Sequence, residues 1–121
     1  MKNIISEKSY SFAICIVKLY KFQIEKKKEY ILSKQILRSG TAIGALVRES
    51  EHAQSKADFL NKMNVALKEA NETEYWLMPL KDTDFITAKQ FESIHADCSE
   101  VLKLLASIVK SSKESLQKSY P

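Results

Sequence analysis

Apolar residues recur along most of this chain at the three- and four-residue spacing of a helix. The clearest stretch runs from Asp58 to Leu77 and continues one turn beyond it. Its seam consists of Phe59, Met63, Ala66, Ala70, Thr73, Leu77 and Leu80. These positions step alternately by four and three, the heptad pattern of a helix packed lengthwise against its neighbours. Because Tyr75, Trp76 and Met78 lie off that seam, the segment carries more apolar surface than one interface uses.

Similar patterns predict three further helices and no strands. The expected helices cover residues of about 6–27, 32–51, 55–79 and 87–112, followed by a frayed tail over 113–121. Four helices joined by short loops favour an antiparallel, up-down-up-down arrangement. The sequence therefore predicts an all-α protein, a four-helix bundle that forms a single domain over residues 1–121.

Polar residues at capping positions mark where these helices begin. Ser55 with Asp58, and Thr87 with Gln90, have the spacing of capping boxes. In a capping box, the side chain of each residue accepts a hydrogen bond from the backbone amide of the other. Ser33 is the candidate cap of the second helix. These signals place the starts of three helices.

Both glycines of the chain fall inside the second predicted helix. Gly40 and Gly44 are four residues apart and share one face, although each costs roughly 1 kcal/mol relative to alanine in a helix interior. Two glycines on one face indicate that another backbone comes close there. A phosphate-binding loop is the alternative, but no strand precedes the pair and no GK[ST] follows it.

Composition supports a helical protein with few turns. The 121 residues include 2 Gly and 2 Pro, and a chain of this length suits one domain. Cys15 and Cys98 each sit inside an apolar helical pattern, so we expect reduced, buried thiols and no disulfide, metal site or other cofactor. No stretch reaches the roughly 18 apolar residues of a membrane span, and we expect a cytoplasmic protein without a membrane partner.

Positive charge is concentrated in the first half of the chain. The net charge is +4, yet residues 1–50 hold 10 Lys or Arg against 4 Glu, while residues 51–121 hold 9 Lys against 11 Asp or Glu. A basic half attracts polyanions such as RNA or DNA; a solvated lysine-rich surface is the alternative. The candidate phosphate contacts are Lys18, Lys21, Lys26, Lys27, Lys28, Lys34 and Arg38.

Two E-x-x-H pairs resemble the ligand motifs of di-iron bundles. They are Glu49 with His52 and Glu92 with His95. The first lies at the end of one helix and the second near the start of another, separated by a helix of roughly 33 Å. Metal ligands must converge, so we expect no metal centre here. Because no nucleophile or dinucleotide motif is present either, we expect no enzyme.

The carboxylates of the third helix are expected to have a structural role. Glu69 and Glu72 share a face near the apolar seam, where a carboxylate needs a cation or a hydrogen-bond donor. Arg38 and Arg48, the only arginines, are the expected partners in structural ion pairs. A catalytic carboxylate pair is the alternative.

Two segments resemble the signature stretches of a known bacterial family. QILRSGTAIGALVRES (Gln35–Ser50) and ADFLNKMNVALKEANETEYWL (Ala57–Leu77) are similar to those of the four-helix bundle proteins encoded in intervening sequences of 23S ribosomal RNA genes. The resemblance covers nearly the whole chain. It implies a small cytoplasmic bundle that assembles as a ring-shaped homopentamer. The chain also resembles the accessory protein of diversity-generating retroelements, a basic pentamer that binds nucleic acid and a reverse transcriptase.

The chain departs from this family pattern at three positions. Members often read GTSIGANIAEA where this chain reads GTAIGALVRES. Ala42 replaces a serine, Leu46 replaces an asparagine and Arg48 replaces a small residue. Leu46 is expected to extend the core seam, while Arg48 adds a positive charge.

Two functions follow as expectations. The first is a non-enzymatic, ring-forming scaffold that associates with nucleic acid through its basic surface, with RNA, including ribosomal RNA, as the candidate ligand. The alternative is an adaptor that docks a partner protein such as a reverse transcriptase and has no direct nucleic-acid role. In either case Tyr75 and Trp76 are the expected contacts between subunits of the homo-oligomer.

Overall fold

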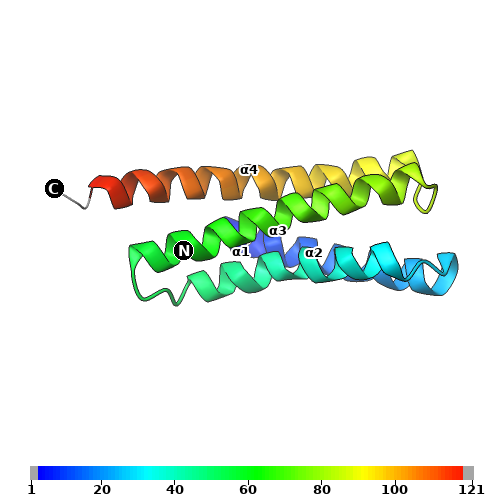
Figure 1. Ribbon diagram of the computed structural model, residues 1–121, viewed down its shortest axis with the longest axis horizontal. Helices are drawn as coiled ribbons and strands as arrows, with labels where there is room; N and C mark the ends of the chain where they lie inside the picture. Colours follow the sequence, from blue (N-terminus) through cyan, green and yellow to red (C-terminus); the bar gives the residue numbers. More distant parts are fainter. Residues whose placement is uncertain (1–2, 119–121) are drawn as a thin grey trace.

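The computed structural model describes residues 3–118, which form four α-helices and one π-helical turn (Figure 1). The elements are α1 (Ile4–Phe22), the π turn η1 (Gln23–Lys27), α2 (Ile31–Ser50), α3 (Lys56–Asp82) and α4 (Ala88–Lys118). Successive helices run antiparallel and pack in chain order (Figure 1). The predicted all-α four-helix bundle is confirmed, and the described residues contain no strand.

Both predicted N-caps form, and Thr87 with Gln90 completes a reciprocal capping box, whereas the Asp58 carboxylate accepts from the residue before Ser55. The Ser55 hydroxyl accepts a hydrogen bond from the Asp58 amide at 3.0 Å, while the Asp58 carboxylate accepts one from the Gln54 amide at 3.2 Å. At the start of α4, the Gln90 amide donates to the Thr87 hydroxyl at 3.1 Å, and the Thr87 amide donates to the Gln90 side chain at 2.9 Å. These bonds fix the first turns of α3 and α4.

The prediction that Ser33 caps the second helix is wrong. Helix α2 starts at Ile31, and the Glu29 carboxylate receives its first amides: those of Ile31 at 3.1 Å, Leu32 at 2.9 Å and Ser33 at 2.7 Å. The Ser33 hydroxyl also donates to Glu29, at 2.5 Å. A carboxylate reaches further than a hydroxyl, so Glu29 serves α2 from two residues before its start.

Two helices run further than the sequence predicts. Helix α3 continues through Pro79 to Asp82, because Leu80 is fully buried and holds the last turn on the core. Helix α4 continues to Lys118, so residues 113–118 of the predicted frayed tail are helical; residues 119–121 lie outside the described part of the chain. Leu116 is half-buried one turn after Ser112, which extends the inward face of α4.

The core follows the predicted seams and includes one buried polar contact between helices. The Thr73 hydroxyl donates a hydrogen bond to the Ser39 hydroxyl at 2.8 Å, which joins α3 to α2. Leu46 is partly buried against the core, as expected of its position in the seam. The fully buried large side chains include Ile16, Ile36, Ile43, Met63, Leu77, Leu80 and Leu105.

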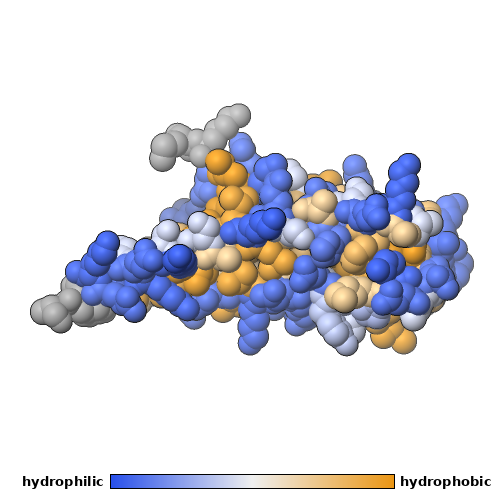
Figure 2. Space-filling view, turned by 90° about the horizontal axis from the view of Figure 1, so that it is seen from above, coloured by the Kyte–Doolittle hydropathy of each residue, from blue (hydrophilic) through white to orange (hydrophobic). Residues whose placement is uncertain are grey.

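The two ends of the bundle differ. The start of α1, the α2–α3 connection and the end of α4 lie at one end, while η1 and the α3–α4 connection lie at the other (Figure 1). The face in Figure 2 is mostly hydrophilic, with hydrophobic residues gathered along its middle. Within the described residues, no helix has the length and apolar character needed to cross a membrane.

Candidate nucleic-acid interface

The positive charge of the molecule comes from one segment, residues 18–38, which we call the basic segment. It covers the end of α1, the π turn η1, the turn that follows and the first half of α2. It holds seven Lys or Arg and two Glu, a net charge of +5, whereas the whole chain has a net charge of +4. The remainder of the protein is therefore almost neutral, and the excess charge gathers toward one end of the bundle.

Six of the seven predicted phosphate contacts are exposed lysines. They are Lys18, Lys21, Lys26, Lys27, Lys28 and Lys34. Within residues 3–118, none of the six forms a salt bridge. Their ammonium groups are therefore free to contact phosphate.

Arg38 differs from these lysines because the structure pairs it with carboxylates. Its guanidinium contacts Glu69 at 3.5 Å and also contacts Glu72. Arg38 was predicted both as a phosphate contact and as an ion-pair residue, and the geometry places it in the ion pair. Its side chain remains about half exposed, so the pair stabilises the fold by no more than about 1 kcal/mol.

Arg48 does not join this ion pair, and its predicted pairing with Glu69 or Glu72 is wrong. It lies ten residues further along α2 and lines a groove on the α1 side, near Glu7 and Tyr10. Arg48 forms no salt bridge within the described residues. The side of a helix on which a residue lies depends on its phase around the axis, and here Arg48 is turned away from α3.

The turn between α1 and α2 is anchored from inside the bundle. Gln23 is fully buried, and its side-chain amide donates to the Phe85 carbonyl in the α3–α4 connection at 3.2 Å. The Gln23 carbonyl accepts from the Glu29 amide at 3.1 Å, and Lys28 between them has a left-handed backbone with φ 56°. The basic segment thus projects its lysines from a fixed backbone. The sequence analysis did not identify this role of Gln23. The feature that could have indicated it is a single polar amide side chain at an otherwise apolar position of the helical pattern.

The Glu29 carboxylate is turned toward the start of α2 and away from the exposed lysines. Burial of its carboxyl opposes ionisation, but hydrogen bonds from the Ser33 hydroxyl and from the first amides of α2 outweigh burial, and the pKa of Glu29 is lowered. Its charge is therefore held against the positive end of the helix. Glu25 is the exposed carboxylate of the basic segment.

The basic segment also exposes large apolar side chains, which sequence reasoning did not single out. Phe22 is 39% exposed, Tyr30 56% and Ile31 77%. The Lys27 ammonium lies 6.0 Å from the centre of the Phe22 ring. Lysines and aromatic rings are thus interleaved on the same surface, a combination typical of nucleic-acid binding.

The two predicted subunit contacts have different environments. Tyr75 is 61% exposed, and Met78 on the same helix is 48% exposed. Trp76 is partly buried against the core, and its indole nitrogen is buried with no hydrogen-bond partner among residues 3–118. The Tyr75 and Trp76 rings meet edge to face, with centres 5.1 Å apart. Trp76 therefore contributes to the core of the bundle, whereas Tyr75 and Met78 present apolar surface outward.

The E-x-x-H residues are used separately. His95 contacts Glu74 of α3 at 3.0 Å and stacks on Phe91 with ring centres 5.0 Å apart. His52 is exposed in the turn after α2. Residues 3–118 contain no group of three or more His, Cys, Asp or Glu side chains arranged to hold a metal ion.

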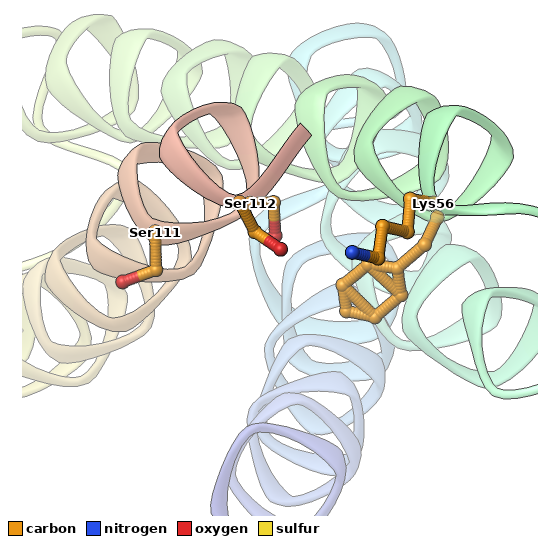
Figure 3. Close-up of a pocket in the computed structure, with 5 residues that line it drawn as sticks. Lys56, Ser111 and Ser112 are labelled. Atoms are coloured by element: carbon orange, nitrogen blue, oxygen red, sulfur yellow. The ribbon is translucent and has the colours of Figure 1, made fainter. Parts of the chain in front are cut away.

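A hollow of about 310 Å³ lies between the start of α3 and the end of α4. It is lined by Lys56, Phe59, Ser111, Ser112 and Ser115. In Figure 3, Lys56 and Ser112 point toward one another, while Ser111 points away. No carboxylate or imidazole is among the lining residues, so the hollow has no side chain suited to act as a general base near neutral pH.

Comparisons with known proteins agree with one another. The family described as 23S rRNA-intervening sequence protein matches residues 1–107 of this chain. The chain is also similar to a protein with unknown function from the S23 ribosomal protein family of Bacteroides thetaiotaomicron VPI-5482, whose crystal structure was determined at 1.70 Å resolution. That similarity covers 88% of this chain and 98% of the other, with 60% sequence identity and a TM-score of 0.86. No curated protein matches.

Proposed function

Because this chain belongs to the 23S rRNA-intervening sequence protein family, we propose that it is a non-enzymatic scaffold that binds nucleic acid through the basic segment. RNA is the first candidate ligand, in keeping with the description of the family. The bundle positions the segment and supplies no reaction. The observation that carries the proposal is the set of six exposed lysines, gathered within residues 18–34, that form no salt bridge in the described part of the chain.

Such a surface binds phosphates by long-range attraction and counterion release. Affinity then falls steeply as salt is added, and the protein distinguishes sequences only weakly because phosphates are alike in every sequence. Lysine suits this role as a mobile point charge on a flexible stem. The amides at the start of α2 are already bonded to Glu29, so the lysine side chains make the phosphate contacts.

We further propose that the protein assembles as a homo-oligomeric ring. The exposed Tyr75 and Met78 on α3, together with Tyr10 and Ile14 on α1, supply apolar surface for contacts between subunits. In a ring of five, as the family resemblance implies, the formal charge would reach about +20, which strengthens attraction of a polyanion. Sedimentation at a mass near that of the 13.8 kDa monomer, at micromolar concentration, would overturn the assembly.

The binding test compares two triple variants of equal charge change. Lys26→Glu/Lys27→Glu/Lys28→Glu alters the basic segment, whereas Lys103→Glu/Lys110→Glu/Lys113→Glu alters exposed lysines of α4. We expect wild-type affinity for an RNA oligonucleotide to fall at least about 10-fold between 50 and 200 mM salt, and the first variant to bind about 10-fold more weakly than the second. Absence of wild-type binding at 50 mM salt, or equal loss in both variants, would contradict the proposal.

A protein-docking adaptor is the second candidate, favoured by the exposed Tyr75 and Met78. It predicts that Tyr75→Ser/Met78→Ser abolishes capture of a partner protein without changing RNA affinity. The two variants separate the functions: a scaffold for nucleic acid loses RNA affinity in the Lys26–Lys28 variant, whereas an adaptor loses its protein partner in the Tyr75/Met78 variant.

A further inference from the structure

We infer that the basic segment binds unpaired nucleotides, with Tyr30 and Phe22 stacking on bases while the neighbouring lysines contact phosphates. The inference rests on the proposed function and specifies its ligand as single-stranded nucleic acid rather than a duplex. It follows from the placement of exposed rings among free ammonium groups.

The rings flank the lysine triplet on both sides. Phe22 closes α1 just before η1, and Tyr30 comes directly before α2. Between them lie the exposed Lys26, Lys27 and Lys28, and the Lys27 ammonium is 6.0 Å from the Phe22 ring centre. A base stacked on either ring would therefore bring its own phosphates within reach of a lysine. Every base has a π-face, so such stacking tolerates sequence.

A duplex would make little use of these rings. Its bases are stacked on one another and present edges only in the grooves, so its outer surface consists of phosphates and sugars. Lysines alone would suffice to bind it. Phe22, Tyr30 and Ile31 are among the eight large hydrophobic side chains left exposed in the described residues, and a charged surface that met only phosphates would have no use for them. Unpaired bases supply the missing partner.

The backbone around the rings is held in place before any ligand arrives. Glu29, the residue before Tyr30, accepts hydrogen bonds from the amides of Ile31, Leu32 and Ser33 after it. The Glu29 amide itself donates to the Gln23 carbonyl. Gln23, the residue after Phe22, is tied to Phe85. Because the backbone beside both rings is held in advance, binding orders only the strand and the exposed side chains, which limits the entropic cost of association.

The test measures the affinity of the full chain for an unstructured 12-nucleotide RNA, the DNA of the same sequence, and the duplex of each, at one low salt concentration. Tyr30→Ala is the main variant, because the Tyr30 ring is exposed and removing it leaves the core intact. Tyr30→Phe retains a stacking ring. Ile4→Ala removes another large exposed apolar side chain, at the start of α1 and outside the basic segment.

We expect wild type to bind single strands at least about 10-fold more tightly than duplexes, and Tyr30→Ala to lose about 5- to 10-fold for single strands only. Tyr30→Phe and Ile4→Ala should bind like wild type. Phe22→Ala should behave as Tyr30→Ala does, provided circular dichroism shows it folded. The RNA and DNA arms identify the source of the strand, since a preference for RNA indicates a contact to the 2′-hydroxyl.

The failures of the two proposals are distinguishable. If single strands and duplexes bind equally and Tyr30→Ala changes neither affinity, the stacking inference is overturned, while weakened binding by the Lys26–Lys28 variant keeps the proposed function. If Tyr30→Ala alters sedimentation and leaves nucleic-acid affinity unchanged, the ring belongs to a subunit contact and the inference falls. If wild type binds no oligonucleotide, both proposals fall.

Discussion

At the scale of single residues, Glu29 connects the stability of the fold to the charge of the candidate interface. Its carboxylate accepts three amides and one hydroxyl at the start of α2. The same inward orientation directs this negative charge toward the helix start and away from the exposed lysines. Sequence reasoning placed the helix start within one residue but assigned its cap to Ser33, because capping residues are usually adjacent to the first turn and Glu29 is two residues before it.

We expect Glu29→Gln to lower the free energy of unfolding by about 1–2 kcal/mol near neutral pH. The pKa of Glu29 is lowered in the folded state, so its contribution is present above the ordinary value of 4.5 and is lost as pH falls through the folded-state pKa. The difference in stability from wild type should therefore shrink below about pH 4.5. Urea unfolding at several pH values measures it.

Glu25→Gln is the matched control for that measurement. It makes the same change of charge four residues earlier, at an exposed position, and should alter stability by less than about 0.5 kcal/mol. Equal effects of the two substitutions would show that net charge, and not the cap, sets the stability.

At the scale of elements, the two glycines of α2 let α1 lie close against it. A Cβ at Gly40 would come within 2.8 Å of the Ile16 side chain, whereas a Cβ at Gly44 would lie 3.4 Å from the Ser9 carbonyl oxygen. The sequence predicted a close backbone approach from the shared face, and Gly44 confirms it. It could not tell that Gly40 instead makes room for a fully buried isoleucine, because that depends on the register between the helices.

These two contacts predict opposite effects of alanine. Gly40→Ala should destabilise the protein by about 1–3 kcal/mol, since Ile16 is fully buried and the new methyl group overpacks the core. Gly44→Ala should be neutral or stabilise the protein by up to about 1 kcal/mol. Alanine has the higher helix propensity, and its methyl group would make only an ordinary van der Waals contact with Ser9. Denaturant unfolding of both variants is the measurement. Equal destabilisation by the two substitutions would contradict the assigned register.

Heptad seams were enough to predict the helices and the bundle, while their ends depended on tertiary contacts. Pro79 is a strong stop signal in sequence, yet α3 continues to Asp82 because burial of Leu80 outweighs one missing backbone bond. For the candidate site, the exposed lysines were predicted from composition alone. The aromatic rings among them were not, since an exposed tyrosine and a core tyrosine look alike in a periodic pattern.

At the scale of the whole molecule, Cys98 reports on the integrity of the bundle. Its thiol is fully buried where α4 packs on α3, with the sulfur 3.7 Å from the Ala70 carbonyl oxygen. Burial, with a smaller contribution from Glu74, raises the pKa of Cys98 to about 12. The reactive thiolate therefore forms only when the helices separate.

In a Cys15→Ser background, we expect a maleimide to modify Cys98 slowly at neutral pH. The opening of the bundle should limit the rate of this reaction. Labelling followed by mass spectrometry should accelerate with urea in parallel with the loss of helical circular dichroism. Cys15, which is partly exposed, should label faster in a Cys98→Ser background. Rapid native-state labelling of Cys98 would show that α3 and α4 separate locally without global unfolding.

The start of α1 and the end of α4 lie at the end of the bundle opposite the turn that carries Lys26, Lys27 and Lys28 (Figure 1). A bundle of this length keeps the two ends tens of ångström apart. A tag, a fluorophore or a surface tether attached at either terminus would thus leave the lysine turn facing solution. Immobilised by its termini, the protein would present its basic end to oligonucleotides in a single orientation, which makes it suited to force or surface-binding measurements.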